Sequence, residues 1–178
     1  DTSRRPLYAA VPAQVVYNTT FKANNVFVIN KGKNHGIQKN MGVISSEGLA
    51  GLVLQSTANY STVMSLLNTN MTVIPNINGM DYYTKLLWTN EAPNKMRSSG
   101  INKLEKLKIG DKVKTGKSSM LFPAGISLGK ITKLNKKPKS QYYETEIQTA
   151  TNFRSLEYVF VIINRDIEEM EALITEND

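Results

Sequence analysis

The sequence predicts an all-β protein with two small β-barrel modules, a few short helical turns and a short C-terminal helix. In the segment 25–53, glycines separate short runs of β-branched and other apolar residues at turn-like spacing, a pattern typical of small, sharply bent barrels. Apolar residues make up 40% of the 178-residue chain but are spread over many short runs. This spread favours two small cores over one large core.

Predicted strands follow one another at short intervals and are separated by turn residues. The polar segment 89–102, which contains Pro93 and Gly100, is predicted to be a loop, and 135–140 is predicted to be a hairpin tip. The strands are predicted at residues 13–17, 26–29, 42–44, 49–55, 62–67, 71–77, 83–88, 112–115, 127–134, 142–149 and 157–163.

Two segments are predicted to be helical. Residues 103–109 could form one turn on Leu104 and Leu107. The segment 166–174 has stronger support, because Asp166 and Glu169 have the spacing of a capping box and the apolar residues that follow share one face. We expect a short terminal helix there.

Composition argues against an enzyme or a metal protein. The chain has no cysteine and a single histidine, His35, in a predicted turn among lysines, whereas a serine-type triad needs a histidine base beside a nucleophile. We interpret the acidic pair Glu144 and Glu146 as cross-strand partners of lysines. We therefore expect no catalytic residue, no metal ligand and no cofactor. The longest apolar run, 158–163, is far shorter than the roughly 20 residues of a membrane-spanning helix.

Charge is unevenly distributed along the chain, whose formal net charge is +7. Thirteen Lys and Arg lie in 95–139 against two acidic residues, and seven acidic residues lie in 157–178 against Arg165. We interpret the lysines as a solvated strand face, with an acidic partner or anionic lipid headgroups as the second interpretation. A third is a basic OB-like β-barrel module that binds single-stranded nucleic acid or another polyanion with Tyr142 and Tyr143. Since the lysine-rich strand 127–134 contains no aromatic residue, we expect no nucleic-acid partner.

Several sequence motifs resemble those of one bacterial family. The segment 25–53 reads NVFVINKGKNHGIQKNMGVISSEGLAGLV, and it is followed by YSTVMSLLN at 60–68, GDKVKTG at 110–116 and LFPAGISLGKI at 121–131. Together these closely resemble the MreC family of rod shape-determining proteins. One departure is Thr115-Gly116, where the family has a serine between the two residues.

The resemblance implies two β-barrels side by side, with a final strand that is able to return to the first. The expected organisation is an N-terminal extension at 1–12, a first barrel at 13–72, a second barrel at 73–165 and a short helix or tail at 166–178. We expect Gly32, Gly36, Gly48, Gly116 and Gly125 to have positive φ, Phe122 and Phe153 to plug cores, and Trp88 to be half-buried. The family-signature residues, which we interpret as structural, are Gly32, Gly36, Gly48, Gly51, Gly110, Asp111, Phe122, Pro123, Gly125, Gly129 and Phe153.

The function implied by the resemblance is a non-catalytic scaffold of the bacterial cell-elongation machinery, which organises peptidoglycan synthesis and cell shape. The implied partners are the protein itself, a class B penicillin-binding transpeptidase, MreD and, indirectly, MreB. The implied location is the periplasm, as the extracytoplasmic domain of an inner-membrane-anchored protein. Because the sequence does not begin with methionine, we expect it to be a fragment, and the resemblance implies that a membrane helix and a coiled coil precede Asp1 in the full-length protein.

Self-association is also predicted from the residues themselves. The runs 11–21 and 59–70 are free of charged residues, and an alternating strand that fills a barrel with one face leaves the other to water or to a neighbour. Val16, Tyr60, Val63 and Leu66 are the candidate interaction residues. The alternative is that both runs are fully buried within one monomer.

Overall fold

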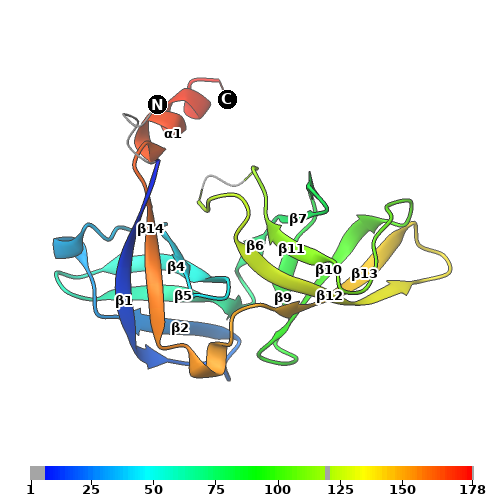
Figure 1. The fold of residues 1–178 in the computed structure, drawn as a ribbon, viewed down its shortest axis with the longest axis horizontal. Helices are drawn as coiled ribbons and strands as arrows, with labels where there is room; N and C mark the ends of the chain where they lie inside the picture. The colour runs from blue at the N-terminus through cyan, green and yellow to red at the C-terminus, as the bar shows by residue number, and fades with distance from the viewer. Residues whose placement is uncertain (1–6, 119–120, 178) are drawn as a thin grey trace.

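The computed structural model describes residues 7–118 and 121–177, and it is mostly β: 49% of the residues are in strands and 9% in helices. Figure 1 shows two β modules side by side and a helix beyond the first of them. The predicted all-β fold class is confirmed, with one closed barrel and one half-barrel sheet in place of the second closed barrel.

The first module is a closed six-stranded barrel with the strand order β1-β14-β3-β4-β5-β2. Its last strand, β14, pairs antiparallel with both β1 and β3, so the end of the chain completes the barrel that the start of the chain begins. Strand β1 begins inside the segment 1–12, which was wrongly predicted to be an extension, because Tyr8 to Pro12 pair with β14. The strands are β1 (Tyr8–Asn18), β2 (Asn24–Ile29), β3 (Gly42–Ile44), β4 (Leu49–Ser56), β5 (Ser61–Asn68) and β14 (Tyr158–Asn164).

The second module is an open eight-stranded sheet with the order β6-β9-β10-β13-β12-β11-β7-β8. Both edge strands, β6 and β8, are very short, which limits the unpaired backbone that the sheet offers to another chain. The strands are β6 (Thr72–Val73), β7 (Pro75–Ile77), β8 (Met80–Asp81), β9 (Leu86–Trp88), β10 (Lys95–Asn102), β11 (Lys112–Thr115), β12 (Ser127–Lys136) and β13 (Tyr142–Thr149).

Three local predictions were wrong. The predicted strand 71–77 is two short strands, β6 and β7, which pair with β9 and β11 respectively. Much of the predicted loop 89–102 is strand β10, which pairs with β9 and β13 and places Met96, Ser98 and Ile101 in the interior. The predicted helical turn at 103–109 is irregular, and Leu104, meant to anchor it, is 88% exposed. The described helices are the short 3-10 helices η1 (Lys33–His35) and η2 (Phe153–Ser155) and the terminal helix α1 (Ile167–Thr175), which was predicted.

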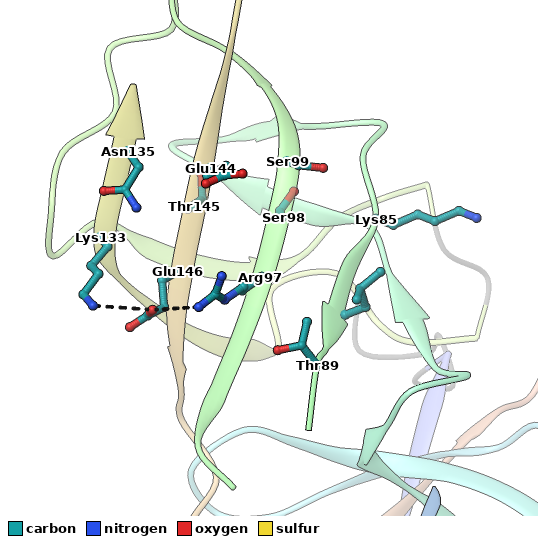
Figure 2. A pocket seen from close by; sticks show the side chains of 11 residues that line it. Lys85, Thr89, Arg97, Ser98, Ser99, Lys133, Asn135, Glu144, Thr145 and Glu146 are labelled. Atoms are coloured by element: carbon teal, nitrogen blue, oxygen red, sulfur yellow. Dashed lines mark ion pairs between the residues drawn. The ribbon is translucent and has the colours of Figure 1, made fainter. Parts of the chain in front are cut away.

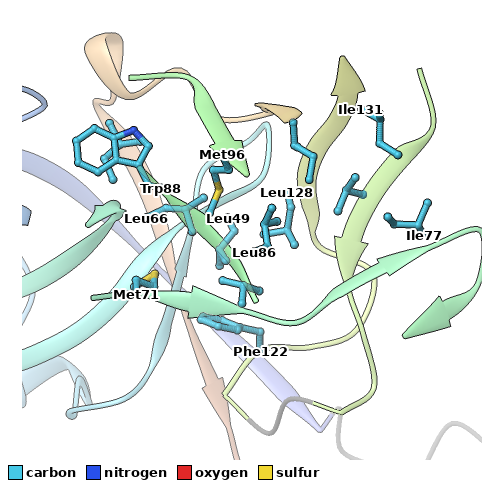
Figure 3. Packing of buried hydrophobic residues seen from close by; sticks show 14 of the residues in the cluster. Leu49, Leu66, Met71, Ile77, Leu86, Trp88, Met96, Phe122, Leu128 and Ile131 are labelled. Atoms are coloured by element: carbon cyan, nitrogen blue, oxygen red, sulfur yellow. The ribbon is translucent and has the colours of Figure 1, made fainter. Parts of the chain in front are cut away.

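Two apolar clusters fill the molecule. One lies inside the closed barrel and includes Phe27 and Val63. The other joins the modules: Leu49 and Leu66 from the barrel pack in one cluster with Trp88, Met96 and Phe122 from the second module, as Figure 3 shows. The modules therefore share a core and do not merely touch. Phe122 and Phe153 are buried plugs, as predicted.

Trp88 was wrongly predicted to be half-buried. It is 1% exposed, and its Nε1 donates a hydrogen bond to the Ala92 carbonyl at 2.8 Å. Residues of the second sheet pack in one cluster with Leu49 of β4 and Leu66 of β5, and Trp88 is buried in the same cluster. A contact between modules of this kind cannot be read from the local pattern of one strand.

Candidate interaction surfaces

The closed barrel has an uncharged outer face. None of its six strands, all of them fully described, contains a charged residue. The exposed part of this surface lies on β1 and β14, where Pro12 is the ladder partner of Phe160 and Gln14 that of Tyr158. A register shift between Val15 and Tyr17 is a bulge, and it leaves two consecutive side chains exposed. Ala10 and Gln14 are also exposed on β1. We call the larger exposed apolar residues of these strands, Pro12, Val16, Tyr17, Tyr158 and Phe160, the apolar face.

The four candidate interaction residues fall into two groups. Val16 and Tyr60 are 53% and 51% exposed, and Val16 belongs to the apolar face, whereas Tyr60 lies in the turn before β5. Val63 and Leu66 are completely buried, so their prediction as surface contacts was wrong. Val63 fills the barrel interior and Leu66 fills the core between the modules.

Tyr158 and Phe160 were missed as surface candidates, although they are 65% and 39% exposed, respectively. The segment 158–163 stood out only as the longest apolar run. Its alternation carried the missing signal: Val159 and Val161 are buried and alternate with the exposed Tyr158 and Phe160, as expected when successive side chains of a strand point to opposite faces.

The outer face of the second sheet is rich in cations and has two hollows. Figure 2 shows the first, of about 270 Å³, where β9, β10, β13 and β12 meet. Its centre is the Glu146 carboxylate, whose Oε2 lies 3.5 Å from Lys95 Nζ, 3.8 Å from Lys133 Nζ and 4.0 Å from Arg97 Nη2. Glu144 pairs with Lys137. Both carboxylates thus partner cations, as predicted, and they do not form a paired acid–base site.

The second hollow, of about 480 Å³, is the lysine trough, which we define by Lys112, Lys114, Lys130, Gly110 and Gly129. Lys112 and Lys114 lie on β11, and Lys130 lies on β12 directly opposite Lys112. No carboxylate of the described residues is within ion-pair distance of these three lysines. The trough is therefore an uncompensated cationic surface.

Of the two tyrosines predicted to stack on bases, only one is exposed on this sheet. Tyr142 is 47% exposed, but Tyr143 is 4% exposed and belongs to the core. The proposed use of Tyr143 by a nucleic-acid-binding module was therefore wrong, since a buried ring cannot stack on a base.

The residues considered for catalysis do not assemble into a reactive group. His35 is exposed in η1, and its Nδ1 accepts a hydrogen bond from the Gly32 backbone at 3.1 Å. Within the described ranges, no three acidic or histidine side chains converge on a point where a metal ion could bind. In the same ranges, no helix has the length and hydropathy needed to cross a bilayer.

One carboxylate with a shifted pKa links the edge of the second sheet to the segment after β11. The Asn76 amide donates to Asp81 Oδ1 at 2.6 Å, and Ser118 donates to Asp81 Oδ2 from its hydroxyl and its backbone. These hydrogen bonds, first that from Asn76 and then that from Ser118, lower the pKa of Asp81. A carboxylate held in this way is a structural tie.

The glycines of the signature serve two different needs. Gly36 and Gly125 have positive φ, as predicted, but Gly32 is extended with φ −145°, which corrects the expectation for that position. Close approach explains Gly32 instead, because an added Cβ would lie 2.3 Å from the Thr57 carbonyl oxygen. The positive-φ prediction was also wrong for Gly48 and Gly116, where a Cβ would meet Ser127 O at 2.3 Å and Asp81 Oδ1 at 2.0 Å.

The remaining signature positions are also structural in their contacts. Gly51 lies on β4 against the Met64 carbonyl of β5, and Gly110 and Gly129 border the lysine trough. The Asp111 carboxylate accepts hydrogen bonds from Asn78 Nδ2 and the Lys108 backbone. The Pro123 carbonyl accepts a hydrogen bond from Thr115 Oγ1 at 2.6 Å.

Comparison with known proteins identifies the family. Residues 15–163 match the family model described as rod shape-determining protein MreC, barrel core. The chain belongs to the MreC family. The cell shape-determining protein MreC of Listeria monocytogenes is 28% identical over 167 residues, which is 87% of this chain and 54% of that protein. The chain thus spans about half the length of this curated MreC relative.

Solved MreC structures share the fold. MreC from Pseudomonas aeruginosa superposes with a TM-score of 0.78 at 17% identity and covers 87% of this chain and 99% of that one. The major periplasmic domain of the cell shape-determining filament MreC gives 0.73 at 19% identity, with 91% and 99% covered. A structure of a complex between a penicillin-binding protein (PBP2) and MreC from Helicobacter pylori gives 0.66 at 15% identity, with 89% and 99% covered.

Proposed function

We propose that this chain is the periplasmic part of a cell shape-determining protein, a non-catalytic scaffold that holds a cell-wall synthase in the elongation machinery. Family membership supports the cell-shape role. The Helicobacter pylori complex of the same family supports a penicillin-binding transpeptidase as partner. In the full-length protein, an inner-membrane anchor would place this domain beside the transpeptidase and MreD, with MreB reached indirectly.

The apolar face is the single observation that carries the docking role. Soluble monomers rarely expose large continuous apolar patches, and such patches mark interaction sites. Here Val16, Tyr17, Tyr158 and Phe160 are exposed on adjacent strands that contain no charge at all. Aromatic residues of this kind are frequent hot spots at interfaces. The face therefore suits a partner of complementary apolar surface, either the transpeptidase or a second copy.

The scaffold role is geometric. Because β1 and β14 are rigidly paired and close the barrel, a partner bound there is held at a fixed position relative to the second module through the shared core. No titratable group of the described residues needs to react for the domain to act in this way.

The test is binding of this domain to a class B penicillin-binding transpeptidase from the same cell, measured by isothermal titration calorimetry. We expect Tyr158→Glu and Val16→Glu each to weaken binding at least tenfold, because each puts a charge into the apolar face. The matched control is Tyr83→Glu, since Tyr83 is 86% exposed but lies on the second module. Wild-type affinity in both apolar-face variants would refute the docking role.

A further inference from the structure

Charge is segregated among three parts of the fold. The strands of the closed barrel carry none, the second sheet carries the lysine trough, and helix α1 carries Glu168, Glu169 and Glu171 with no basic residue. Figure 1 places α1 beyond the end of β14, away from β11 and β12. The acidic helix is therefore not positioned to neutralise the lysine trough of its own chain.

The trough brings like charges together. Lys112 and Lys130 are Cα partners across the β11–β12 ladder, so their Cβ atoms are about 4.5–5.5 Å apart on one face, and such a like-charge pair is destabilising. Lys114 is two residues further along, roughly 7 Å away on the same face. An anionic partner that reached all three ammonium groups would remove this repulsion.

Two glycines line the trough. Gly129 has φ 152°, and an added Cβ would lie 1.9 Å from the Gln148 carbonyl oxygen, so this position on β12 accepts only glycine. Gly129 and Gly110 line a trough of about 480 Å³ beside the lysines. The space is open to side chains that enter from outside the molecule.

Helix α1 has the complementary pattern. Glu168 and Glu171 are three residues apart, which puts their Cβ atoms about 5–6 Å apart on one face, close to the spacing of Lys112 and Lys130. No side chain of α1 is buried, and its nine residues are fewer than the roughly 12–15 that an isolated helix needs for even marginal stability in water. No residue of the helix belongs to either apolar cluster of the described chain.

We propose that the acidic face of α1 from one copy, centred on Glu168 and Glu171, binds the lysine trough of a second copy. Different surfaces of the two molecules meet in this contact, so it is heterologous and adds copies head to tail. This contact uses none of the residues of the apolar face. It goes beyond the proposed function and does not depend on binding of the transpeptidase.

Sedimentation velocity of the domain over a concentration series tests this contact at low and high salt. Exposed charges are screened over about 30 Å at 0.01 M salt but 3 Å at 1 M, so we expect association at low salt and at least a tenfold loss at 0.5 M. Lys112→Glu/Lys130→Glu and Glu168→Lys/Glu171→Lys should each give a similar loss at low salt. A chain that carries all four changes should regain association, as should an equimolar mixture of the two double variants.

The controls separate this contact from general charge and from the apolar face. Lys22→Glu/Lys39→Glu changes the net charge by the same amount as Lys112→Glu/Lys130→Glu, but at exposed sites outside the trough. It should leave association unchanged. If the two charge variants associate like wild type, or if the four-fold variant folds but does not associate, the contact is overturned. Loss of association in Val16→Glu/Tyr158→Glu alone would support the apolar face and overturn this proposal.

Cross-linking gives a second readout, because the chain has no cysteine of its own. Gln148 lines the trough opposite Lys130, and Ala172 lies one turn after Glu168 on α1, so cysteines at these sites keep every charge of the contact. A Gln148→Cys chain mixed with an Ala172→Cys chain should form a heterodimer with a short bis-maleimide at low salt and much less at high salt. A Lys22→Cys chain mixed with the Ala172→Cys chain should not. Equal yields in the two mixtures would contradict the predicted pairing.

Discussion

Leu66 reports whether the two modules fold as one unit. Leu66 belongs to strand β5 of the closed barrel, but its side chain is completely buried in one cluster with Trp88, Met96 and Phe122 of the second module. Leu66→Ala removes buried carbon atoms at this junction, and such changes cost 2–5 kcal/mol. We expect a loss of about 3 kcal/mol, since a junction of strands from two modules has little freedom to collapse.

Urea denaturation followed by two probes measures this effect. Trp88 is the only tryptophan, so its fluorescence reports on the second module, whereas far-UV circular dichroism reports on all strands. With an m-value of about 2 kcal/mol per molar urea, the midpoint should fall by roughly 1.5 M. The matched control is Val63→Ala inside the barrel cluster, which should cost about 2 kcal/mol.

The two probes should give coincident transitions in the wild type and in both variants, because the shared core couples the modules. If Leu66→Ala lies within about 0.5 kcal/mol of the wild type, the junction is not a core. If Val63→Ala shifts the dichroism but not the Trp88 transition, the modules unfold separately and the reasoning is refuted.

Three further predictions follow from single sites. Gly51→Ala should destabilise the barrel by about 1–3 kcal/mol in the same urea assay, because its Cβ would lie 2.1 Å from the Met64 carbonyl oxygen of the neighbouring strand; a wild-type midpoint would contradict this. Asp81→Asn should cost about 1 kcal/mol at pH 7, and the difference should vanish in acid. The Asp81 pKa is lowered in the folded state, so its contribution is present above the unfolded pKa and is lost as the pH falls through the folded value; an equal difference at pH 7 and pH 2.5 would refute it. Fluorescence anisotropy should detect no tight, sequence-preferring complex with single-stranded DNA or RNA at physiological salt, since Tyr143 is buried, and such a complex would revive the polyanion-binding alternative.

Local pattern was enough to predict much of the fold. The alternation of apolar residues and the glycine turns located most strands, and Phe122 and Phe153 are in cores as expected. Strand β10 was missed because its inward positions include Ser98 and because a register shift between Ser98 and Ile101 interrupts the alternation. A strand cannot be predicted from alternating apolar residues where a polar residue occupies an inward position beside a bulge.

The interaction surface was harder to predict because burial of one strand depends on distant strands. The alternation on β5 correctly indicated two apolar faces, but which face meets water depends on where the second sheet packs. That sheet covers Leu66 of β5 and leaves Val16 of β1 exposed. The sequence patterns of the two strands do not contain this difference, because it arises from the packing of the second module.

The return of β14 to β1 and β3 has a consequence for how the chain folds during synthesis. The whole second module, from β6 to β13, is inserted between β5 and the strand that closes the first barrel. A nascent chain that ends before Tyr158 lacks β14, so the edges of β1 and β3 that pair with β14 remain open. Long-range closure of this kind is slow, and unpaired edges invite wrong partners. The amino-terminal barrel therefore begins with the first strand of the chain and closes only with the last, so its two edges stay unpaired until β14 has been made.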